Sequence, residues 1–150
     1  MANDDYRHPG SIHAGLALLR VILGIVFIAH GGQKLFQYGI AGVTQGFGQM
    51  GVPLPAIAAP VVTGVELLGG ILLVVGLFTR VVASLTAIDM LGATLLVHLK
   101  NGFFGPMGIE FTLTLCAASL AFVLAGPGAF SLDAVIARRR SPRLAAEGRV

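Results

Sequence analysis

Three ionisable residues, Arg20, Glu66 and Asp89, lie within long apolar runs of the sequence. A charge at the centre of a bilayer costs roughly 2.5–3.5 kcal/mol on insertion scales, so each residue is expected to face a partner, a water-filled cavity or a ligand. One carboxylate is expected to pair with Arg20. The other would be protonated, hydrogen-bonded or paired with His30, and a buried carboxylic acid can exchange protons with a ligand. The alternative is an ion pair that only fixes the register of packed helices.

A second set of polar residues lies near one end of the apolar runs: His30, Lys34, His98, Lys100 and Glu110. These side chains would form a polar vestibule, and its histidines could titrate near neutral pH. A histidine and a glutamate can also bind metals, but no His-x-x-Glu or Glu-x-x-His spacing is present, so no metal site is predicted. The alternative is that Lys34, His98 and Lys100 only mark a membrane interface.

The composition indicates the environment in which these side chains act. Hydrophobic residues make up 55% of the 150 residues and charged residues 11%, whereas soluble domains carry about 25% charged residues. The sequence therefore predicts a membrane protein. Because Cys116 is the only cysteine, disulfide and Cys-x-x-Cys chemistry within this chain is excluded. Much of the net charge of +3 comes from a C-terminal run of arginines, which favours a topology signal over nucleic-acid binding.

Four apolar runs, at about 12–36, 56–78, 81–99 and 109–125, are predicted to cross the membrane. Lipid leaves backbone groups no partners outside the segment, so each run is expected to be a helix. Short connections predict an antiparallel four-helix bundle, with a tight turn at Thr79-Arg80 and an interfacial helix over 43–50 in the long connection. The chain is divided into a polar N-terminus (1–11), the transmembrane domain (12–137) and a basic tail (138–150).

The distribution of lysine and arginine predicts the orientation of the bundle. With four spans both termini share one side, and that side holds Arg7, Arg80 and the five arginines at 138, 139, 140, 143 and 149. The other side holds only Lys34 and Lys100. The excess of positive charge predicts that both termini are cytoplasmic.

Several spaced motifs resemble those of the DoxX-like family of membrane proteins. They are Arg20-x-x-x-Gly24-x-x-Phe27-x-x-x-Gly31-x-x-Lys34, Gly51-x-Pro53-x-Pro55, Glu66-x-x-Gly69-Gly70, Gly76-Leu77-x-Thr79-Arg80, His98 with Gly102-Phe103-Phe104 and Glu110, and Gly126-Pro127-Gly128-x-x-Ser131-x-Asp133. The resemblance covers about residues 12–137. It implies a four-helix inner-membrane protein of a family commonly labelled as oxidoreductases, some members of which are linked to quinone detoxification.

The first functional hypothesis is a membrane oxidoreductase component that binds a quinone or a similar isoprenoid head group. Glu66, Asp89 and His30 would exchange protons, and the ligand would be bound by Arg20, Lys34, His98 and Glu110. The sequence has no haem, flavin or iron–sulfur signature of its own, so a soluble redox partner or a homo-oligomer is expected to complete the activity. The alternatives are a non-enzymatic scaffold, a subunit that binds a lipid or small molecule, and a small oligomeric transporter.

Overall fold

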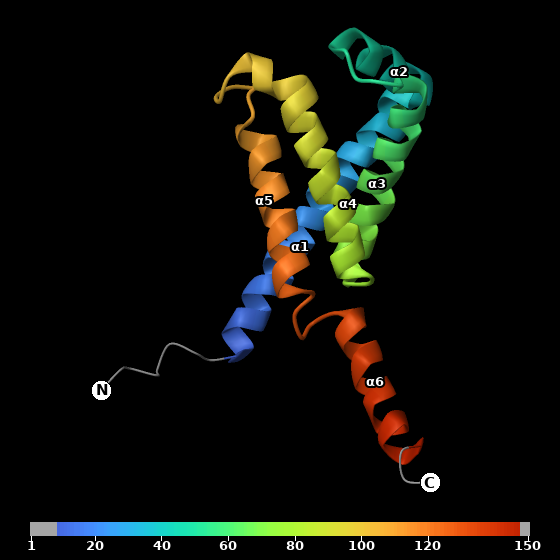
Figure 1. Ribbon diagram of the computed structural model, residues 1–150, viewed down its shortest axis with the longest axis vertical. Helices are drawn as coiled ribbons and strands as arrows, with labels where there is room; N and C mark the ends of the chain where they lie inside the picture. Colours follow the sequence, from blue (N-terminus) through green and yellow to red (C-terminus); the bar gives the residue numbers. More distant parts are fainter. Residues whose placement is uncertain (1–8, 148–150) are drawn as a thin grey trace, which may run out of the picture.

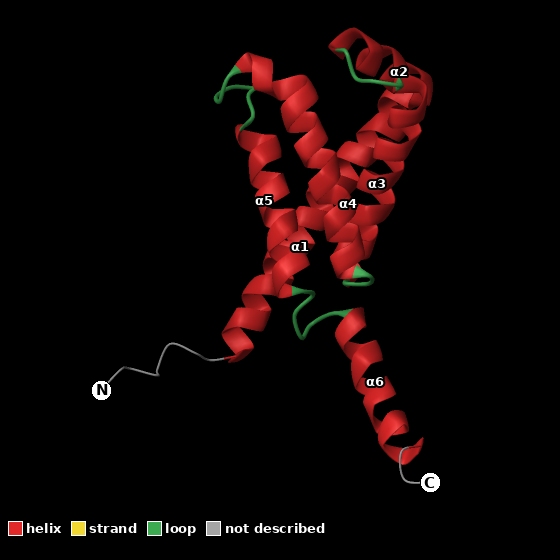
Figure 2. Ribbon diagram, viewed as in Figure 1, coloured by secondary structure: helices red, strands yellow, loops and turns green. Residues whose placement is uncertain are grey.

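The computed structural model describes residues 9–147, and it is helical apart from short loops over that part of the chain (Figures 1 and 2). The elements in chain order are α1 (Pro9–Gly32), η2 (Gln33–Tyr38), α2 (Gly39–Met50), α3 (Pro55–Val75), α4 (Thr79–Gly92), η3 (Ala93–His98), η4 (Leu99–Asn101), α5 (Glu110–Ala125) and α6 (Leu132–Glu147). Four of them, α1, α3, α4 and α5, form the predicted antiparallel bundle.

Three helical stretches are long and apolar enough to cross a membrane: Gly10–Met50, Pro55–Val75 and Thr79–Asn101. The fourth, α5, is apolar but has 16 residues, which at ~1.5 Å per residue is shorter than the hydrocarbon core. Leucine and isoleucine side chains such as Leu18, Leu68, Leu95 and Leu120 are exposed on the outer faces of the helices, where lipid is expected to cover them.

The bundle is built from two helix pairs that pack by different means. Helix α1 contacts α3 most extensively, because glycines bring the two backbones together. A Cβ added at Gly24 would lie 2.7 Å from the Gly70 carbonyl oxygen, and one added at Gly31 would lie 2.4 Å from the Leu67 nitrogen. Gly24, Gly31 and Gly70 therefore allow the close packing of the two helices.

The second pair, α4 and α5, is held by hydroxyl groups across a buried seam. The Thr86 and Ser119 hydroxyls lie 3.1 Å apart, and those of Thr94 and Thr112 lie 2.8 Å apart. All four side chains are buried. Phe27, Leu73 and Phe122 fill the core where the two pairs meet.

The two pairs meet at one end of the bundle and diverge toward the other, which gives the V shape of Figure 1. We call the first end the terminal end, because Pro9 and Glu147 lie on that side. The α3–α4 turn also lies there and consists of Gly76, Leu77 and Phe78, with Gly76 and Phe78 at positive φ. The predicted turn at Thr79-Arg80 is wrong by about two residues, since both residues begin α4.

At the diverging end the long connection forms a helix, as predicted. The predicted segment 43–50 forms the larger part of α2, which begins at Gly39, where φ is +68° and the chain changes direction after η2. Helix α2 packs against α3 and ends at Gly51, whose φ is +83°. The connection therefore covers part of the diverging end.

Helix α6 leaves the bundle after Gly126 and extends away from it (Figure 1). It runs through the predicted domain boundary at residue 138, so the basic tail begins as a continuation of this helix. The cytoplasmic orientation of the termini stays a prediction.

Candidate functional site

A cavity of about 870 Å³ lies between the two helix pairs at the diverging end. Its wall is formed by α1, η2, α2, α3, α4, η3 and α5 and by the loops that precede α3 and α5. Phe27, Val43, Phe47, Val62 and Leu115 make much of it apolar. A volume of this size is in the range that holds a drug-sized ligand or a cofactor ring.

Five polar residues in this wall form what we call the polar cluster: His30, Lys34, Glu66, Asp89 and His98. Two of them lie in π-helical segments, Lys34 in η2 and His98 in η3. π-Helical turns are rare and occur often at functional sites, because the wider turn redirects side chains. Both segments line this cavity.

Lys34 and Glu66 form an ion pair that joins η2 to α3, and its short hydrogen bond runs from Nζ to Oε2. The Glu66 residue is 3% exposed, whereas the Lys34 side chain is 20% exposed. A half-buried lysine beside a buried carboxylate compensates that charge and can donate further hydrogen bonds.

Asp89 projects from α4 into the same cavity and is within electrostatic reach of Glu66 and Lys34. Its Oδ2 atom is buried and has no hydrogen-bond partner. Leaving a buried polar atom without a partner costs about 1–3 kcal/mol. Asp89 therefore lines the cavity with a carboxyl group that has one buried oxygen atom without a hydrogen-bond partner.

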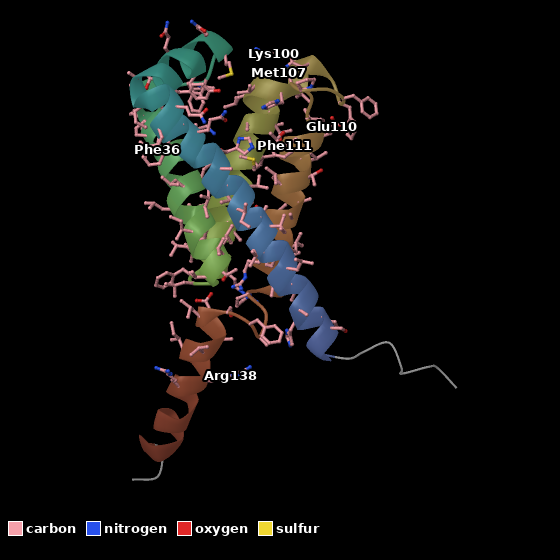
Figure 3. The ribbon with its side chains drawn as sticks, turned by 180° about the vertical axis from the view of Figure 1, so that it is seen from behind. Phe36, Lys100, Met107, Glu110, Phe111 and Arg138 are labelled. Atoms are coloured by element: carbon pink, nitrogen blue, oxygen red, sulfur yellow. The ribbon has the colours of Figure 1, made fainter. Side chains whose placement is uncertain are left out.

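The two histidines lie at the edges of the cavity. His30 on α1 is exposed and contacts Phe111 on α5, with ring centroids 5.5 Å apart. The Nδ1 atom of His98 lies 2.9 Å from the Met107 carbonyl oxygen, which ties η3 to the loop before α5. In Figure 3, Phe111 lies between the helix pairs, while Lys100, Met107 and Glu110 lie closer to the diverging end.

Two predicted residues of the vestibule lie outside this wall. The Glu110 carboxylate accepts a hydrogen bond from the Gly105 backbone nitrogen at 3.2 Å and so closes the loop before α5. Lys100 is exposed in η4 and does not line the cavity. Of the five residues expected in the vestibule, only His30, Lys34 and His98 line the cavity.

The predicted pairing of Arg20 with Glu66 or Asp89 is wrong. Arg20 is 2% exposed and lies at the terminal end, where its Nη2 donates a hydrogen bond to the Phe130 carbonyl at 2.7 Å. Its guanidinium group occupies the space that a side chain at Gly76 would need: a Cβ there would lie 1.3 Å from Arg20 Nη1. Glu66 instead pairs with Lys34, which the sequence analysis had placed in the second polar set, near one end of the apolar runs.

Asp133 was named in the sequence analysis only as part of the C-terminal family motif and was given no role. Its carboxylate accepts hydrogen bonds from the backbone nitrogens of Phe78 at 2.8 Å and Thr79 at 2.9 Å, and so caps the start of α4 from α6. Its own backbone nitrogen donates to the Gly76 carbonyl. The available signal was an aspartate in the first turn of a helix that follows a Gly-Pro-Gly stop. Arg20, Gly76, Thr79, Phe130 and Asp133 are called the terminal clasp below.

The fold and the cavity together define a class: a small antiparallel four-helix membrane protein with a polar cluster in an apolar cavity at one end. The described residues contain no group of three or more His, Cys, Asp or Glu side chains placed to hold a metal ion. Comparison with known proteins identifies the class further. The DoxX family model matches residues 15–99, and the chain belongs to the DoxX family.

Three relatives show how far the similarity extends. The chain is 42% identical over 123 residues to a Bacillus subtilis protein named "Putative oxidoreductase CatD", covering 82% of this chain and 87% of that protein. It is 32% identical to the inner membrane protein YphA of Escherichia coli, covering 79% and 87%, and 32% identical to YqjF of the same organism, covering 83% and 94%. No solved structure matches the chain. With its apolar helices, it is a multi-pass protein of the plasma membrane.

Proposed function

We propose that this protein is the membrane component of a quinone-linked oxidoreductase and that the cavity holds the quinone head group. The observation that carries the proposal is the Lys34–Glu66 pair together with Asp89, whose buried Oδ2 has no hydrogen-bond partner, in the wall of an otherwise largely apolar cavity. One relative is named "Putative oxidoreductase CatD", which supports the same reaction class.

The residues of the cavity fit a quinone. A quinone ring is flat and apolar, with two carbonyl oxygens that accept hydrogen bonds, and the cavity offers apolar walls together with the Lys34 ammonium group as a donor. Asp89 in its protonated form would be a second donor. When bound, a quinone supplies a two-electron acceptor that takes up two protons on reduction.

Each residue of the polar cluster then has a distinct role. Lys34 binds and orients a ligand oxygen, and Glu66 holds the ammonium group in place through the ion pair. Asp89 holds a proton at Oδ2 that it can pass to the ligand. His30 and His98, at the edges of the cavity, are placed to return protons to the site, since an imidazole ring can act as an acid or a base. The electrons would come from a soluble partner protein.

The test is mass spectrometry of the lipid extract from the full chain purified in a mild detergent. We expect a stoichiometric quinone with the unsubstituted protein and its loss in Asp89→Leu, which removes the donor. Glu110→Leu is the matched control, because it makes the same change of acid to apolar side chain outside the cavity wall. A non-quinone lipid bound at one copy per chain would refute the redox proposal and favour a lipid-binding subunit. No bound molecule in any sample would favour a scaffold.

A further inference from the structure

A second, smaller hollow of about 260 Å³ lies along the seam between α3 and α4. Its wall contains only apolar side chains and glycines, among them Val65, Gly69 and Leu72 on α3 and Val82 and Leu85 on α4. Leu85 is 47% exposed and Leu68, which also lines the hollow, is 62% exposed. The hollow is therefore a groove that opens toward the lipid.

The groove continues the wall of the large cavity in register. On α4, Ile88 lines the cavity and Leu85 and Val82 line the groove, at successive three-residue steps. On α3, Val62 lines the cavity and Val65 lines the groove, again three residues further along. Residues three or four apart lie on one face of a helix, so the groove begins close to where the cavity wall ends on α3 and α4. The two helices run side by side there (Figure 1).

The opposite side of the cavity, between α1 and α5, offers a different surface. There the polar ring of His30 lies against Phe111, and both residues line the cavity. A long hydrocarbon chain that leaves the polar cluster would meet an imidazole on that side and only apolar groups on the α3–α4 side. The apolar α3–α4 seam is therefore the more favourable route for a hydrocarbon tail.

We infer that the ligand is an amphiphile with a long hydrocarbon tail, whose head group lies at the polar cluster and whose tail lies in the α3–α4 groove. This inference rests on the proposed function and narrows its substrate class from quinones in general to tailed, membrane-borne quinones. Gly64 is the residue that keeps the groove open. It lines the groove, and a Cβ added there would meet no atom within 4 Å, so a larger side chain would fill the groove without displacing a neighbour.

The experiment compares the binding of two labelled probes to the full chain in mild detergent: decylubiquinone and a tail-less probe, the same dimethoxy-methyl-benzoquinone ring without the decyl chain. Gly64→Leu should weaken the binding of decylubiquinone about ten-fold and leave the tail-less probe unchanged. Gly15→Leu is the matched control. Gly15 also lies in a long helix, where an added Cβ would meet no atom within 4 Å, but it does not line the groove. It should leave the binding of both probes unchanged.

Two results would contradict the placement of the tail in the groove, and both can be distinguished from failure of the proposed function. If Gly64→Leu leaves decylubiquinone binding intact, or weakens both probes equally, the tail does not lie in the groove. If the unsubstituted protein binds neither probe, the proposed quinone site is wrong, and the proposed tail site in the groove is wrong as well. Binding of the tail-less probe also reports whether the variant is folded. Leu85→Trp, which narrows the groove from α4, gives a second variant with the same expected pattern.

Discussion

The terminal clasp and the polar cluster both place charged side chains inside an apolar bundle, but they treat them differently. In the terminal clasp, Arg20 Nη2 donates to a backbone carbonyl, and the Asp133 carboxylate accepts two backbone N–H groups. The Nε and Nη1 atoms of Arg20 are buried without a hydrogen-bond partner, and Gly76 leaves room for little but the guanidinium group. These charges serve the backbone.

In the polar cluster the charged side chains line a cavity. Lys34 and Glu66 pair with each other across two helices, and Asp89 Oδ2 is buried without a hydrogen-bond partner. Because both regions contain buried polar atoms without partners, such an atom does not by itself mark a site. The cavity beside the polar cluster distinguishes the two regions. Substitutions in the two regions should separate stability from binding.

The largest effect is expected for Gly76→Ala in the terminal clasp. The residue has φ of +71°, and the new Cβ would overlap Arg20 Nη1, so strain and steric conflict add. We expect the free energy of unfolding to fall by about 2–5 kcal/mol, measured by denaturant titration in mild detergent. The control is Gly51→Ala, where φ is +83° but no atom lies within 4 Å. It should cost only about 1–2 kcal/mol, and equal losses for the two variants would contradict the steric argument.

The next effect is expected for Lys34→Met in the polar cluster. The substitution leaves the Glu66 carboxylate buried without its partner. Because Lys34 is partly exposed, we expect a loss of about 2–3 kcal/mol, at or below the low end of the range for fully buried pairs. The double variant Lys34→Met/Glu66→Gln should recover most of this loss. A double variant as unstable as the sum of the two single variants would show that the two residues do not interact.

A smaller effect is expected for Asp133→Ala. It removes the acceptors of the Phe78 and Thr79 nitrogens at the start of α4, and loss of a helix cap costs about 1–2 kcal/mol. Thermal unfolding measures the loss of stability. The quinone content of the purified variant shows whether the terminal clasp also affects binding at the polar cluster. Stability should fall while bound quinone per folded protein stays constant. Loss of the quinone at unchanged stability would show that the clasp acts on the cavity.

The helices themselves could be predicted from the sequence, because 20-residue apolar runs allow few other structures in lipid. The polar contacts could not. The sequence analysis grouped Arg20 with Glu66 and Asp89 because all three lie within apolar runs, but position in a run does not show on which face of a helix a side chain lies. The segment after Gly126 folds back to supply the Phe130 carbonyl and Asp133, and no local pattern predicts that return.

The contacts of Lys34 could not be predicted from the sequence either. It was grouped with the polar residues near one end of the apolar runs, yet it lies in a π-helical segment and reaches Glu66. A π-turn shifts the helical phase by adding a residue to the turn, so residue counting based on an ideal α-helix places the following side chains on the wrong face. The family motifs placed Lys34 and Glu66 in the right protein class without showing that they meet.

The smallest effect on stability is expected for Asp89→Leu, and it tests the comparison most directly. Leucine has nearly the shape of the aspartate side chain but no polar atom, so it removes the buried Oδ2 atom that has no hydrogen-bond partner. We expect the free energy of unfolding to stay the same or to rise by about 0.5–1 kcal/mol, while bound quinone is lost. A loss of more than ~2 kcal/mol would mean that Asp89 stabilises the fold as the clasp residues do. The polar cluster would then be a second structural contact, and the distinction between the two ends of the bundle would not hold.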